Sequence, residues 1–237
     1  MLRRAILLSV VFASLGSTVH ATAGESAGMA AVMQSAMASL RTAASYGRTG
    51  NIALAQIELD DARRAWAALG RIKDQPAHYS AKSLKDLLTE GDDRLRKADA
   101  SLAAGDGGAA TADIAAVRQA LHVLRRQAGV VELGDCVFEL RPAMDDLHRF
   151  AADFAAARAT AAEVNRAGEA LRAQLQRCNG LAAPDIAGQA EFRRLIDGAA
   201  TSAQNIGRAA HEGDTGLVHR YEIELQSFVN LLDFRFG

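Results

Sequence analysis

The sequence predicts an all-α protein composed of tandem antiparallel four-helix bundles built from repeated helical hairpins. Apolar residues recur in steps of three and four along most of the chain, which is the spacing of helices with one buried face. The chain is rich in alanine and has only three prolines, so its intrinsic helix propensity is high. Glycine-rich tetrapeptides separate the periodic segments, as expected of short turns between antiparallel helices.

The first residues have the organisation of a secretory signal peptide. Arg3 and Arg4 precede the apolar run AILLSVVFASLG (5–16), and small residues follow it in STVHATA. The apolar run is too short to cross a bilayer, which requires about 20 residues. We therefore predict a signal peptide over residues 1–23, cleaved after Ala21 or Ala23, and export to the periplasm.

The charge balance argues against two classes of partner. The chain has 27 Lys and Arg against 28 Asp and Glu, a formal net charge of −1 at pH 7. Nucleic acids and acidic membrane surfaces are recognised by basic patches, which this balance does not supply. No later segment is apolar over the length of a membrane span. The expected partner is therefore another periplasmic protein, without nucleic-acid binding or membrane insertion after cleavage of the signal peptide.

Apolar periodicity and its interruptions define the predicted helices. Residues 52–69 and 84–102 show the narrow apolar face that suits packing at a shallow crossing angle. The predicted helices cover residues 26–46, 51–71, 83–104, 110–127, 136–157, 161–178, 187–211 and 216–234. The break near Arg158–Thr160 contains neither Gly nor Pro, so one helix over 140–178 stays open as the alternative.

Two stretches of the chain repeat the letters of a turn and a helix. Residues 47–59 read GRTGNIALAQIEL and residues 213–225 read GDTGLVHRYEIEL, and a further G-x-x-G occupies 105–108. We interpret the match as a duplicated helical hairpin in which Gly50 and Gly216 are equivalent, with convergence on a favourable turn as the alternative. Paired hairpins give two bundles, which places the predicted domains at 24–130 and 131–237.

Cys136 and Cys178 are the two cysteines of the chain. In an oxidising compartment such a pair is expected to form a disulfide. Cys136 begins the predicted fifth helix and Cys178 ends the sixth, so an antiparallel hairpin brings them together. A single helix over 140–178 would instead hold its ends about 57 Å apart. The disulfide and the break near residue 158 therefore depend on each other.

The sequence lacks the usual motifs of catalysis. It contains no local signature of a nucleophile beside a base. It has no Glu-x-x-His of the di-iron type and no C-x-x-C-H for covalent haem, and its one Asp-x-x-His joins Asp145 to His148. We assign no role to His78, His211 or His219. The expected protein is not an enzyme.

Three methionines near the start of the mature chain suggest an alternative function. Met29, Met33 and Met37 are spaced so that their thioethers line one face of the first helix. Soft sulfur ligands suit Cu(I), whereas flexible Met side chains also fill bundle cores. Val32 and Leu40 extend the same face, which favours core packing. Copper binding by the three methionines is retained as an alternative.

The segment VRQALHVLRR (117–126) suggests a second alternative. Four of its residues form an Arg-x-Ala-x-His pattern followed by another arginine: Arg118, Ala120, His122 and Arg126. In these residues the N-terminal half resembles the soluble periplasmic four-helix cytochromes b of the b-562 family. The resemblance implies haem b with Met29 and His122 as axial ligands and with Arg118 and Arg126 beside it. The second half of the chain has no equivalent ligand pair.

The preferred prediction is an exported, non-catalytic binding or interaction protein. The alternative is a haem b or copper carrier that uses the Met and His ligands of the first bundle. Each ligand type also has an ordinary structural role in a bundle, and this favours the interaction protein.

Overall fold

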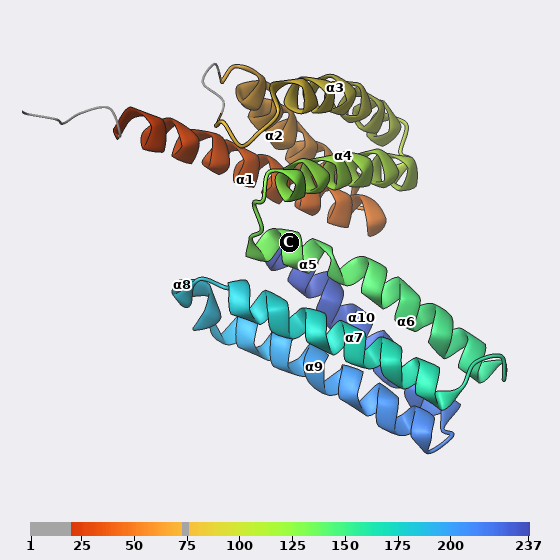
Figure 1. Ribbon diagram of the computed structural model, residues 1–237. Helices are drawn as coiled ribbons and strands as arrows, with labels where there is room; N and C mark the ends of the chain where they lie inside the picture. The colour runs from red at the N-terminus through yellow and green to blue at the C-terminus, as the bar shows by residue number, and fades with distance from the viewer. Residues whose placement is uncertain (1–19, 73–75) are drawn as a thin grey trace, which may run out of the picture.

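The computed structural model describes residues 20–72 and 76–237, and side chains from Gly28 onward (Figure 1). All regular secondary structure in these ranges is helical, with no strand, so the all-α prediction is confirmed. Residues 1–19 of the predicted signal peptide lie outside the described residues. Of the helices described, none combines the length and apolar character needed to span a membrane.

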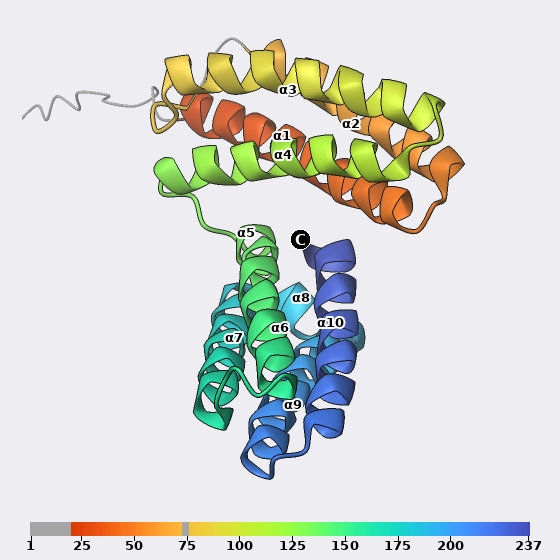
Figure 2. The same cartoon turned by 90° about the vertical axis from the view of Figure 1, so that its right-hand side faces the viewer.

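Four long helices make up the N-terminal unit. They are α1 (His20–Arg48), α2 (Ile52–Gly70), α3 (Ala81–Ala103) and α4 (Gly107–Gln127). Consecutive helices pack as antiparallel neighbours and α4 returns to α1 (Figure 2). Trp66 of α2 is buried over Gly91 of α3, where a Cβ atom would overlap the indole ring. The Trp66 Nε1–H donates to the Leu88 carbonyl oxygen at 3.3 Å, so this contact joins α2 to α3.

The C-terminal unit contains the remaining helices. They are α5 (Leu133–Phe138), α6 (Leu140–Ala155), α7 (Ala161–Leu181), α8 (Pro184–Ala187), α9 (Ala190–His211) and α10 (Thr215–Phe236). The prediction of one helix over 136–157 is wrong, because α5 and α6 are separated at Glu139. The short α8 was also not predicted; Pro184 stands at its first position, where the missing N–H costs nothing.

The helices α6 and α7 are separate, which excludes a single helix over 140–178. Ala157 has a left-handed φ of 56° and ends α6. Thr160 then begins α7 in a capping box, because Glu163 Oε2 accepts the Thr160 N–H at 2.7 Å and Thr160 Oγ1 accepts the Glu163 N–H at 3.3 Å. The Thr-x-x-Glu spacing is thus a helix-start signal that attention to Gly and Pro alone misses.

Cys136 of α5 and Cys178 of α7 lie at disulfide distance, as the sequence predicts. Their Cα atoms are 5.3 Å apart, and both residues are buried. The bond is possible because the break between α6 and α7 returns the chain antiparallel to itself. The expected dependence of the pair on this break is therefore met.

The hairpin turns correct the predicted repeat. Gly50, Gly105 and Gly213 have φ values of 75°, 78° and 74°. Each is followed by an Asn or Asp whose side chain accepts an N–H from the first turn of the next helix. Gly216 instead lies inside the first turn of α10, so the pairing of Gly50 with Gly216 is wrong. Gly213 is the equivalent of Gly50, because the turn requires a left-handed glycine next to a capping residue rather than the letters G-x-T-G.

The buried positions follow this corrected register. In α2, α4, α7 and α10 the residues 4, 8, 11, 15 and 18 positions after the N-cap are all buried. The two Ile-Glu-Leu segments do not occupy the same positions in this register. Leu59 is the eighth residue after the N-cap of α2, whereas Leu225 is the eleventh residue after the N-cap of α10. The match in letters was therefore displaced by three residues from the match in structure.

Each unit has its own cluster of buried apolar residues. One cluster extends from Met29 to Leu124 and the other from Leu133 to Leu232. The predicted domain boundary after residue 130 falls between the two clusters. That the two units are separate domains stays a prediction.

Candidate functional site

Polar contacts between the units gather where α4 faces α5 and the end of α10; we call this region the inter-unit interface. Arg118, His122 and Arg125 are buried and follow one face of α4. Asp135 of α5 and Asp233 of α10 are also buried. Basic groups of the N-terminal unit therefore meet acidic groups of the C-terminal unit away from water.

Arg118 and Asp233 form a paired contact at the centre of the inter-unit interface. Nη2 and Nη1 of Arg118 donate to the two carboxylate oxygens at 2.6 and 3.2 Å, and the side chains are 2% and 7% exposed. Arg141 Nη2 donates to the same carboxylate at 3.3 Å. Burial alone would raise the pKa of Asp233, but the hydrogen bonds and charge of Arg118, with Arg141 and Arg48, lower it below its usual value. Asp233 is therefore ionised at neutral pH.

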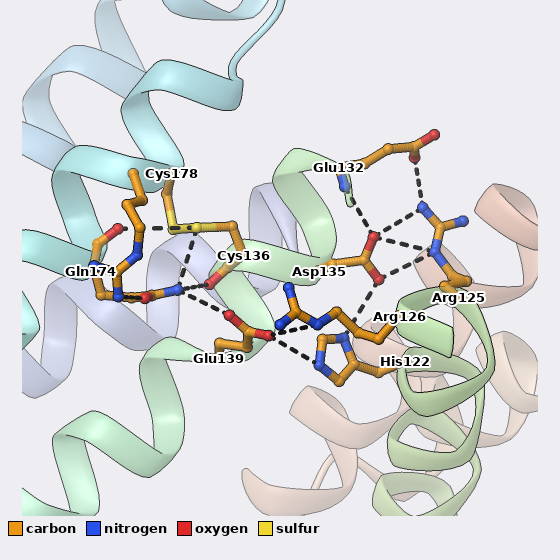
Figure 3. Close-up of polar contacts among 10 residues, drawn as sticks. His122, Arg125, Arg126, Glu132, Asp135, Cys136, Glu139, Gln174 and Cys178 are labelled. Carbon is orange, nitrogen blue, oxygen red and sulfur yellow. Dashed lines mark hydrogen bonds and ion pairs between the residues drawn. A yellow bond between two sulfur atoms is a disulfide. The ribbon is translucent and has the colours of Figure 1, made fainter. Parts of the chain in front are cut away.

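Arg125 ties α4 to the start of α5. Its Nε donates to Asp135 Oδ1 at 3.0 Å, and its Nη2 reaches Glu132 Oε2 at 2.7 Å. Asp135 Oδ2 also accepts the backbone N–H of Glu132 at 3.0 Å (Figure 3). Burial favours a lower pKa for Arg125, but the bonds to Asp135 and Glu132 raise it above its usual value. The segment that connects the units is thus held by a charged arginine.

His122 lies beside this arginine and faces two carboxylates (Figure 3). Its Nδ1 is 3.4 Å from Asp135 Oδ1 and its Nε2 is 3.2 Å from Glu139 Oε1. Arg126 Nε lies 3.6 Å from the same Glu139 oxygen. The ring packs near Phe138, with centroids 5.2 Å apart. Axial binding of haem iron would require one of the two imidazole nitrogens to leave its carboxylate.

The methionines of the copper alternative lie in the core of the N-terminal unit. Met29, Met33 and Met37 are 1%, 0% and 7% exposed and pack within one apolar cluster. No three His, Cys, Asp or Glu side chains in the described part of the chain are grouped to hold a metal ion. The haem set of Met29, His122, Arg118 and Arg126 and the copper set of methionines stay predictions.

A cleft of about 520 Å³ opens beside the inter-unit interface, with walls from both units. Its apolar lining includes Met37, Val131, Leu181, Ile186 and Phe236, and its polar lining includes Arg41, Arg125 and Glu132. Val131 and Leu181 are 42% and 40% exposed, so an apolar surface remains open to a partner. Arg41 donates to the backbone oxygens of Phe234 and Arg235 at 3.0 and 3.1 Å and so fixes the end of α10 against α1.

The sequence analysis selected part of this region only through the haem alternative, which stays a prediction. Arg118, His122 and Arg126 were singled out for haem, whereas the structure brings them to Asp233, Asp135 and Glu139. The available signal was a charged residue adjacent to a buried apolar position, such as Arg118 after Val117 or Asp233 after Leu232. The cleft had no local signal, because its lining comes from distant segments.

No protein-family model, curated protein or solved structure matches the chain. The resemblance to the b-562 family therefore rests on the residues given for it above.

Proposed function

We propose that the chain is an exported, non-catalytic binding or interaction protein of the periplasm. The observation that carries the proposal is the cleft between the units, whose rim residues Val131 and Leu181 leave apolar surface exposed. A cleft lined by both apolar and charged side chains is suited to a segment of another protein that has apolar and polar groups. The partner that we propose is therefore a periplasmic protein.

The proposed architecture is two tandem antiparallel four-helix bundles that arose from a repeated hairpin. Three left-handed glycines each precede a capping Asn or Asp, and four helices share one register of buried positions. The shared spacing of buried residues from the N-cap supports duplication more strongly than the sequence match does, because the sequence match is displaced by three residues.

Export is supported by two independent features. The predicted signal peptide is the first, and the buried Cys136–Cys178 pair is the second, because disulfides persist in oxidising compartments. Cell fractionation with mass analysis tests the proposal: we expect a periplasmic chain that begins after Ala21 or Ala23. A full-length chain retained in the cytoplasm would contradict it.

Site-specific photo-crosslinking in cells tests the cleft as the binding site. A photoreactive residue at Leu181 should give a discrete adduct with an exported protein. The matched position is Ile57, which is 57% exposed on α2 and does not line the cleft, and there no adduct is expected. Val131→Asp on the cleft rim should abolish the Leu181 adduct. Equal adducts from both positions, or none from Leu181, would reject the cleft.

The carrier alternative is retained because three buried methionines share one face of α1. Purified protein that takes up haemin should show a Soret band that Met29→Ala or His122→Ala abolishes. Cu(I) titration with a Met33→Leu variant tests the copper set. A colourless protein that ignores haemin, with Cu(I) binding unchanged in Met33→Leu, would exclude both carriers.

A further inference from the structure

The end of α10 is held by a side chain from the other unit. Arg41 of α1 donates from Nε to the Phe234 carbonyl oxygen at 3.0 Å and from Nη2 to that of Arg235 at 3.1 Å. Its Nη1 donates to the Gly237 oxygen. The last carbonyls of a helix have no partner within the helix, and a cation beside them also complements the negative end of the helix dipole. One guanidinium therefore caps α10 across the two units.

The capped segment is also a wall of the cleft. Arg235, Phe236 and Gly237 line the cleft from α10, and Met37 and Arg41 line it from α1. Figure 2 shows the end of α10 directed at the N-terminal unit. The shape of the cleft therefore depends on where the last turn of α10 lies relative to α1, and the side chain of Arg41 joins the two.

The guanidinium group is suited to this task by its shape as well as its charge. Arginine presents its N–H donors in a rigid planar fork, so contacts with three carbonyl oxygens fix the orientation of the helix end. Burial and the charge of Arg118 lower the pKa of Arg41, while Asp233 raises it, and an arginine remains protonated at neutral pH. A lysine at this position would retain the charge but not the fork. Charge and orientation can therefore be separated by experiment.

Other contacts between the units reach the same helix end outside the cleft. Arg118 of α4 pairs with Asp233, and Tyr46 of α1 meets Phe234 edge to face with ring centroids 6.3 Å apart. None of these four residues lines the cleft. Loss of the Arg118–Asp233 pair should weaken the association of the units, whereas loss of the Arg41 fork should displace a cleft wall.

We propose that Arg41 is a positioning residue for partner binding, because its fork holds the last turn of α10 in place as a wall of the cleft. This role rests on the proposed function and deepens it, since it makes partner binding depend on the contact between α1 and α10. Arg41 acts through the backbone of residues 234–237 and not through a charge offered to the partner.

Hydrogen exchange of the full mature chain tests the positioning step without a partner. Arg41→Ala and Arg41→Lys should each speed amide exchange in residues 234–237 by about tenfold, while α2 and α3 keep their protection. The matched control is Gln34→Ala. Gln34 also lines the cleft from α1, but its Nε2 donates to Glu132 Oε2 at 3.2 Å and not to α10, so exchange in 234–237 should be unchanged. Unchanged exchange in both Arg41 variants would overturn the proposal.

The photo-adduct from Leu181 in cells tests the consequence for the partner. Arg41→Ala and Arg41→Lys should each reduce the adduct severalfold, with thermal unfolding of each variant as the folding control. Arg63→Ala, which removes an arginine of α2 outside the cleft, should keep the adduct. If Arg41 offered its charge directly to the partner, Arg41→Lys would keep the adduct, and this result would reject the positioning role.

The two measurements separate failure of this proposal from failure of the proposed function. Faster exchange in residues 234–237 with an undiminished Leu181 adduct in both Arg41 variants would reject the role of Arg41 and leave the cleft as the binding site. No adduct from Leu181 in the wild type would reject the cleft itself, and the role of Arg41 in partner binding with it.

Discussion

The N-terminal and C-terminal units place their buried residues in the same register but fill it with different chemistry. In α2 and α4 all five register positions are apolar. In α7 and α10 the same positions include Gly168, Cys178 and Glu222. The N-terminal unit packs Trp66 over Gly91, whereas the C-terminal unit has the Cys136–Cys178 pair. The comparison shows that the register sets the architecture, while its occupants decide how each unit is stabilised.

The units also differ in the charge that they bring to the inter-unit interface. The N-terminal unit contributes Arg118 and Arg125, and the C-terminal unit contributes Asp135 and Asp233. The pairs Arg118–Asp233 and Arg125–Asp135 therefore join the units, and Asp233 is also contacted by Arg141 of its own unit. Substitutions in a core should therefore affect one unit, whereas substitutions in the inter-unit interface should affect the coupling of both.

Trp66→Ala should have the largest effect and should be confined to the N-terminal unit. Truncation of a buried aromatic residue costs about 3–5 kcal/mol of unfolding free energy. Trp66 is 1% exposed and its indole fills the space over Gly91. Hydrogen exchange resolved by mass spectrometry should show lost protection in α1–α4 and retained protection in α6–α10. Gly70→Ala, at a site with open space, is the control, and equal loss in both units would contradict the comparison.

Removal of the disulfide should destabilise the C-terminal unit and leave the N-terminal unit unchanged, the opposite of the effect of Trp66→Ala. Cys136 and Cys178 are separated by 42 positions, and a crosslink over a loop of that size contributes about 4 kcal/mol. Cys136→Ala/Cys178→Ala should lower the denaturant midpoint of α6–α10 without changing α1–α4. Native protein should also be two protons lighter than its reduced form by mass analysis. Two free thiols in oxidised native material would refute the prediction.

Breaking the Arg118–Asp233 pair should uncouple the units rather than unfold one of them. Asp233→Ala leaves a buried arginine without its main partner, which costs about 3 kcal/mol. Denaturation followed by unit-specific hydrogen exchange should show two transitions that lie further apart than in wild type. Arg118→Met/Asp233→Leu should recover most of the loss, because no buried charge of the pair remains. A double variant as unstable as the sum of both single variants would indicate that the two residues act independently.

Acid should reproduce the Asp233 effect in the wild type. The pKa of Asp233 is lowered in the folded protein, so its contribution is present above the usual carboxyl pKa and is lost as pH falls through the lowered folded value. Thermal unfolding across the acid range should therefore show a stability loss in wild type that is reduced in Asp233→Asn. Identical acid profiles would mean that Asp233 does not contribute to the coupling.

The smallest change in stability should come from substitution of the hairpin glycines. It tests whether Gly213 or Gly216 is the equivalent of Gly50. Gly213→Ala places a side chain at φ 74° with no neighbouring atom within 4 Å, so backbone strain of about 1 kcal/mol is the whole cost. Gly216→Ala lies in the first turn of α10 and should be neutral or stabilising. Thermal unfolding measures both. If Gly216→Ala were destabilising and Gly213→Ala were not, Gly216 and not Gly213 would be the equivalent of Gly50.

The helical class, most helix ranges and the disulfide could be predicted from the chain alone, because apolar spacing and hairpin geometry are local properties. The separation of α6 from α7 was readable in the same way, since Thr160 and Glu163 are only three positions apart. The tertiary structure was needed to show that Gly213, and not Gly216, corresponds to Gly50. Backbone conformation and burial define that register, and a repeated sequence motif does not determine either of them.

The polar sites depended on the tertiary structure entirely. Arg118 and Asp233 are 115 positions apart, and His148 and Glu222 are 74 apart, so no spacing rule connects them. In its local sequence, each of these residues looks like an ordinary charged residue next to an apolar one. Only the packing of α4 against the end of α10, and of α6 against α10, decides that the charges are buried together and paired, because desolvation and pairing depend on what the other helix presents.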